Sequence, residues 1–69
     1  MRQVILIPDS ESGGFTVTVP SLPGCLSEGD TYEEAMTNIR DAIALYIEDL
    51  IADGDPVPED MAPIQVALI

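Results

Sequence analysis

The chain has 69 residues, and its 13 Asp and Glu side chains outnumber its two Arg side chains, which gives a net charge of −11. A chain this short forms one small domain that buries only about 60% of its unfolded surface, so a partner would help to stabilise it. The sequence has no His and one Cys, which excludes His-dependent triads, Cys/His zinc sites and an internal disulfide. The acidic charge argues against nucleic acid as a direct ligand and favours a basic protein as the partner.

The hydrophobic residues indicate a folded protein. They make up 46% of the chain and lie in periodic runs, which excludes intrinsic disorder. No apolar run approaches the roughly 18 residues of a membrane span. The amino terminus has a short apolar stretch with no small-residue cleavage site behind it, so we interpret it as a strand of a cytoplasmic protein.

Three strands are predicted in the first half of the chain. Gln3–Ile7 is a β-branched and leucine run, and Phe15–Val19 alternates strictly between apolar and threonine residues. The polar segment Asp9–Gly14 joins them as a longer hairpin loop. After the proline-bearing connector Pro20–Gly24, the short run Cys25–Glu28 completes an antiparallel meander.

A long helix follows the strands. Thr31 and Glu34 have the spacing of a capping box, in which each side chain bonds to the backbone of the other residue, and Gly54 is placed to end the helix at Asp53. These 22 residues would span about 33 Å. At 100° per residue, the core side of the helix contains Ala35, Met36, Ile39, Ala42, Ile43, Tyr46 and Leu50. The opposite side contains Glu33, Glu34, Thr37, Asp41, Ala44 and Glu48.

The last run, Ile64–Ile69, reads as a fourth strand, which makes the element order β-β-β-α-β and the fold class α+β. A right-handed crossover would place this strand beside the first one and parallel to it, in the sheet order 3-2-1-4. The helix would then cover one face of the sheet, with Phe15, Val17 and Val19 beneath it. The other face would stay open.

The sequence also predicts a homodimer. Ile64–Ile69 is an uncharged, proline-free edge strand of the kind that aggregates unless something pairs with it. The helix is longer than strands of about 20 Å, so its last turns need other cover. The candidate interface residues are Ile47, Leu50, Ile51, Ile64, Val66 and Leu68.

The central part of the chain resembles the HicB family of antitoxins. The resemblance rests on a dense set of residues: Phe15, Val17, Pro20, Leu22, Pro23, Gly24, Cys25, Ser27, Gly29, Thr31, Glu34, Ala35, Asn38, Asp41, Ala42 and Ile43. It implies a single HicB-like domain over residues 1–69 with a partial ribonuclease-H-like fold. Many members carry a further DNA-binding domain, and we expect none in this chain.

The resemblance also implies a partner, a small basic toxin of the HicA type that cleaves mRNA and whose surface the antitoxin masks. The acidic helix residues Glu33, Glu34, Asp41 and Glu48 are candidates for the toxin contact, although a charged outer helix face is often only solvated. The alternative is a HicB-like homodimer that binds a different protein.

Catalysis is not expected, and neither is a cofactor or a metal. Ribonuclease-H chemistry needs converging acids on two metal ions, but the runs Val4–Leu6 and Ile64–Ile69 contain none. Cys25 is interpreted as a small buried residue rather than a nucleophile. Asn38 is assigned a structural hydrogen bond in preference to a partner contact. Arg40 has no acid three or four residues away on its helix, so it would pair with another element or chain.

Overall fold

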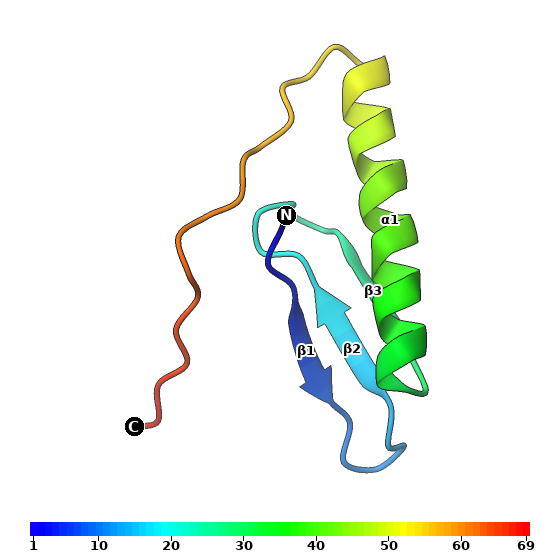
Figure 1. Ribbon diagram of the computed structural model, residues 1–69, viewed down its shortest axis with the longest axis vertical. Coiled ribbons are helices and arrows are strands. Elements are labelled where there is room, and N and C mark those ends of the chain that lie inside the picture. Colours follow the sequence, from blue (N-terminus) through cyan, green and yellow to red (C-terminus); the bar gives the residue numbers. More distant parts are fainter.

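The structure, a computed structural model, describes residues 1–69 and contains three strands and one long helix. The strands are β1 (Ile5–Pro8), β2 (Phe15–Thr18) and β3 (Leu26–Gly29), and the helix is α1 (Tyr32–Ala52). The strands form an antiparallel sheet in the order β1-β2-β3, and α1 packs against β2 and β3 (Figure 1). The predicted α+β class and the three-stranded meander are confirmed, with strand ends within two residues of those expected.

The core lies between the sheet and α1. Its six buried residues are Val17, Val19, Leu22, Cys25, Ala35 and Ile39. Four of them were predicted: Val17 and Val19 by the alternation of Phe15–Val19, and Ala35 and Ile39 by the helical period. Cys25 is buried as expected, and burial raises the pKa of its thiol.

Leu22 is a core residue that the sequence patterns did not indicate. It lies in the turn between β2 and β3, where its N–H donates to the Val19 carbonyl and its own carbonyl accepts from the Cys25 N–H, at 3.0 Å each. These bonds fold the turn inward, so that the Leu22 side chain is fully buried. A turn flanked by prolines has no periodicity from which its inward residue can be identified.

The ends of α1 largely follow the predicted capping pattern. The Thr31 hydroxyl accepts from the Glu34 N–H at 3.1 Å, which caps the first turn. The Glu34 carboxylate accepts from the Asp30 N–H at 3.4 Å, one residue earlier than a standard capping box requires. At the other end, Gly54 takes a φ of 75°, and the Asp55 N–H donates to the Leu50 carbonyl at 2.9 Å, which satisfies a terminal carbonyl of the helix.

Gly29 sets the distance between β3 and the start of α1. A Cβ atom at this position would overlap the backbone of Glu34 and Ala35. Only glycine therefore allows the end of β3 to run directly against the first turn of the helix.

The helix extends beyond the sheet, as predicted. Its 21 residues span about 31 Å, whereas four-residue strands span about 13 Å. Figure 1 shows the last turns of α1 standing above the strands. Ile51 in this part of the helix is 65% exposed.

The predicted fourth strand does not form in this structure. After α1 the chain returns along the β1 side of the molecule in an extended path, and residues 64–69 have no strand structure (Figure 1). The sheet therefore has three strands, and the order 3-2-1-4 is not confirmed.

Gln3 explains why this segment stays away from the sheet. Its side-chain Nε2 donates to the carbonyls of Met61 and Ala62 at 2.9 and 3.1 Å, and its Oε1 accepts from the Ile64 N–H at 2.8 Å. The carboxamide makes the hydrogen bonds that the backbone of a neighbouring strand would make. The segment is thus held one side chain away from the backbone that leads into β1.

Candidate protein-binding surfaces

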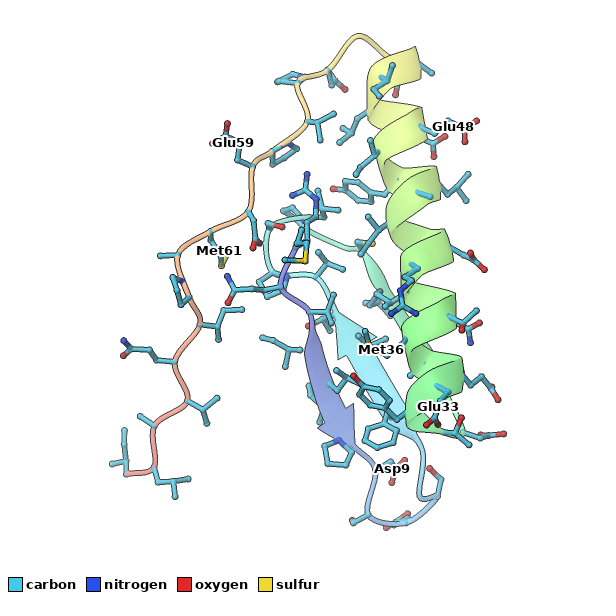
Figure 2. The ribbon with its side chains drawn as sticks, in the orientation of Figure 1. Asp9, Glu33, Met36, Glu48, Glu59 and Met61 are labelled. Atoms are coloured by element: carbon cyan, nitrogen blue, oxygen red, sulfur yellow. The ribbon has the colours of Figure 1, made fainter.

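The four acidic residues singled out on the helix, Glu33, Glu34, Asp41 and Glu48, are all exposed. Glu34, Asp41 and Glu48 follow one another at seven-residue intervals, about two helical turns, so they lie nearly in a line with successive Cα atoms about 10.5 Å apart. Figure 2 shows Glu48 projecting from α1 away from the sheet. Leu45, beside this line, is 60% exposed. The structure therefore places these residues together on one acidic helix face.

A second acidic surface adjoins the beginning of that face. It is a polar hollow of about 290 Å³ between the hairpin loop, the end of β3 and the first turns of α1. Four carboxylates line it, from Asp9, Glu28, Asp30 and Glu34. The Asn38 side chain also lines it and donates to the Glu28 carbonyl at 2.8 Å, which agrees with the structural role predicted for that residue.

Asp9 is held in a fixed position at the rim of this polar hollow. Its Oδ1 accepts from the N–H groups of Glu11 and Ser12 at 2.9 and 3.3 Å, and these hydrogen bonds lower the pKa of the carboxyl. The loop thus presents an ionised, oriented acceptor at neutral pH.

Sequence analysis did not identify Asp9, Glu28 or Asp30 as parts of a surface. They come together because the sheet register sets Phe15 opposite both Pro8 and Gly29, which brings the hairpin loop beside the end of β3. Register is a long-range property, and no local spacing in the sequence encodes it. The polar hollow shares Glu34 with the acidic helix face, so the two form a continuous acidic surface.

This acidic surface cannot be neutralised from within the chain. The chain has thirteen acids and two arginines, so its net charge is 2 − 13 = −11 and its own side chains cannot balance it. Arg2 bonds to Ser21 Oγ at 3.1 Å and to the Pro58 carbonyl. Arg40 is exposed and lies with Arg2 at an apolar hollow of about 460 Å³ on the other side of the molecule's core, between α1 and the start of β1.

The predicted dimer residues lie in two separate places. Ile47, Leu50 and Ile51 belong to α1, where Ile51 is exposed and the other two are half-buried. Ile64 is half-buried, whereas Val66 and Leu68 are 90% and 97% exposed on the extended segment. Within one chain the structure does not bring the two groups together (Figure 1).

The structure shows neither a metal site nor a membrane-spanning helix. No group of three or more His, Cys, Asp and Glu side chains is placed to hold a metal ion, and the four carboxylates of the polar hollow line it without converging. No helix combines the length and the apolar character needed to cross a membrane.

Comparisons of the sequence with known proteins agree on one family. The family model described as the HicB-like antitoxin of bacterial toxin-antitoxin systems matches residues 3–68. A UPF0150 protein of Synechocystis sp. is 50% identical over 56 residues, covering 81% of this chain and 71% of that protein. The protein named Antitoxin HicB 1 of Photorhabdus laumondii is 34% identical over 58 residues, covering 84% of this chain but 37% of the relative.

A solved structure supports the same assignment. A chain of the HicA3 and HicB3 toxin-antitoxin complex superposes with a TM-score of 0.72 at 31% sequence identity, over 91% of this chain and 73% of the other. Sequence and fold thus point to the same group of proteins. The chain belongs to the HicB-like antitoxin family of bacterial toxin-antitoxin systems.

Proposed function

We propose that this protein is an antitoxin that binds a small, basic, mRNA-cleaving toxin of the HicA type and covers the toxin's RNA-binding surface. The observation that carries the proposal is the continuous acidic surface of α1 and the polar hollow, which has no cations of its own. Family membership and the match to a chain of a HicA3 and HicB3 complex support it. An antitoxin family also indicates a regulatory role rather than an enzymatic one.

The physical basis is competition for positive charge. A protein that cleaves RNA binds phosphates through Lys and Arg side chains, and releases counterions when it does so. Carboxylates at intervals of about 10.5 Å along a helix offer those side chains an alternative set of anions. The acidic surface would both accelerate encounter with the toxin and occupy the groups that RNA needs.

We also propose that the antitoxin is a homodimer, with contacts drawn from Ile47, Leu50, Ile51, Ile64, Val66 and Leu68. The exposure of Ile51, Val66 and Leu68 supports this, because apolar side chains of this size gain free energy when a second copy removes them from water. A dimer of this kind is also compatible with the alternative function, in which the partner is a protein other than a HicA-type toxin.

Charge reversal tests the toxin-binding proposal. One variant carries Glu34→Lys, Asp41→Lys and Glu48→Lys, and its matched control carries Asp53→Lys, Asp55→Lys and Glu59→Lys beyond the end of α1. Each changes the net charge by 3 × 2 = 6, from −11 to −5. Stopped-flow association with a HicA-type toxin should be at least about tenfold slower for the first variant at low salt, with the difference shrinking as salt is added.

The control should slow association much less, because it leaves the helix face intact. Circular dichroism would verify that both variants are folded. Equal slowing of the two variants would show that only net charge matters, and an unchanged rate in both would remove the acidic helix face from the interface.

A further inference from the structure

The sheet is uncovered on the β1 side. Because α1 packs over β2 and β3, an apolar hollow of about 460 Å³ remains between the helix and the start of β1. Its apolar lining comes from Met1, Val4, Met36, Ile39 and Ile43. Figure 2 shows Met36 on the side of α1 that faces the sheet. The two cations of the chain, Arg2 and Arg40, both lie at this apolar hollow.

The strand next to this hollow is an edge strand. β1 pairs only with β2, so its other side is free. The Gln3 N–H, just before β1, donates to the Asp60 carboxylate at 3.1 Å, away from β2. Within β1, the hydrogen bond from the Asp9 N–H to the Gly14 carbonyl sets Ile5 and Ile7 to bond with β2, so the alternation of the strand places the N–H of Leu6 on the outer side. A free edge with an apolar hollow beside it is suited to the addition of an extended segment.

The chain contains such a segment. Residues 64–69 have no charged side chain, and Val66 and Leu68 are almost fully exposed. The segment cannot close onto its own β1 without breaking the Gln3 hydrogen bonds to Met61, Ala62 and Ile64 that hold it away. It is thus presented outward, as an unpaired extended segment of high β-propensity.

We propose that residues 64–69 are exchanged between two copies of this chain, each segment pairing with the free β1 edge of the other copy. The strand alternation would direct Ile64, Val66 and Leu68 toward the apolar hollow. This inference deepens the proposed homodimer, because it names the segment and the edge that form it. Reciprocal exchange closes after two copies, because each copy's segment and each copy's β1 edge are then both used.

The charges around the β1 edge favour a second copy of this chain, and not the toxin, as the partner that binds there. Residues 61–69 and 3–8 carry no charged side chain, so two chains of net charge −11 meet there with the least repulsion. Arg2 and Arg40 at the apolar hollow attract an acidic chain and repel a basic one. The acidic surface on α1 is left for the toxin.

The test is the mass in solution of the protein without toxin. Analytical ultracentrifugation should give twice the chain mass of 7.4 kDa for the native protein and one chain mass for a protein truncated after Pro63. The truncation removes none of the six core residues, so the truncated protein should keep its fold by circular dichroism. Val66→Lys with Leu68→Lys should weaken dimerisation at least about tenfold, because two apolar side chains lose their buried position.

The matched control is Gln65→Lys with Ala67→Lys, which adds the same charge on the opposite side of the strand and should change dimerisation little. Hydrogen exchange gives an independent measurement, since the Leu6 amide should gain protection as the concentration of the native protein rises. A monomeric native protein would overturn both the dimer and the exchange. A dimer that survives truncation would keep the dimer but overturn the exchange, leaving the helix end as the interface, and neither result would alter toxin binding.

Discussion

Leu22 shows how much of the stability of this small domain rests on single residues. It is among the largest fully buried side chains, yet it lies in a turn. We expect Leu22→Ala to lower the free energy of unfolding by about 2–5 kcal/mol, because it removes buried methyl groups and leaves a cavity. Urea unfolding monitored by circular dichroism measures this loss.

Leu26 provides the matched control. It begins β3 on the open face of the sheet and is 60% exposed, so Leu26→Ala should cost less than about 1 kcal/mol. Equal losses for the two variants would contradict the assignment of Leu22 to the core.

Among the elements, the extended segment after α1 is held by several hydrogen bonds to Gln3, and the one that can titrate is the contact between Gln3 and Asp60. Burial raises the pKa of the Asp60 carboxyl, but hydrogen bonds from the Gln3 side chain and backbone, with smaller contributions from the Met61 backbone and the Ser21 side chain, together outweigh burial and lower its pKa overall. A lowered folded-state pKa means that the ionised form stabilises this contact. The stabilisation is complete above the ordinary Asp pKa of about 3.9 and is lost as the pH falls through the lower folded-state value.

This predicts a weaker contact between Gln3 and Asp60 in acid. The backbone and side-chain amide resonances of Gln3 should be constant from pH 7 to about pH 5 and should move as the pH falls below about 4. Asp60→Asn removes the titrating group and should abolish that movement. Gln3 resonances that stay constant in the native protein, or that move equally in Asp60→Asn, would contradict the account.

The sequence patterns predicted these elements unequally. Alternation in Phe15–Val19 and the helical period after Thr31 are local, and they identified the meander, the helix and the acidic helix face. The position of Ile64–Ile69 depends on hydrogen bonds to Gln3, which is far away in the sequence. The bond from the Gln3 N–H to the Asp60 carboxylate, for example, joins residues 57 positions apart. The polar hollow depends on sheet register for the same reason. Local patterns carry no information about which distant side chain will take a strand's hydrogen bonds.

For the whole molecule, the structure separates an acidic surface from a neutral edge. The acidic helix face and polar hollow lie on one side of the core, and the β1 edge with residues 64–69 lies on the other. Two variants should therefore lose different properties. Val66→Lys with Leu68→Lys should become monomeric and still bind a HicA-type toxin, whereas the triple Lys variant at Glu34, Asp41 and Glu48 should bind the toxin weakly and still dimerise.

Ultracentrifugation and titration calorimetry, applied to both variants, measure the two properties separately. Loss of both properties in either folded variant would show that the two surfaces are coupled and would contradict their separation.

The central claim is that the protein masks the RNA-binding surface of a basic toxin. The most direct test is the cleavage of a labelled RNA by a purified HicA-type toxin, titrated with this protein. We predict that cleavage stops near one antitoxin chain per toxin and that RNA binding by the toxin is lost at the same ratio, because the acidic surface occupies the cationic groups that RNA needs. Full cleavage activity in the presence of excess folded protein would contradict the account.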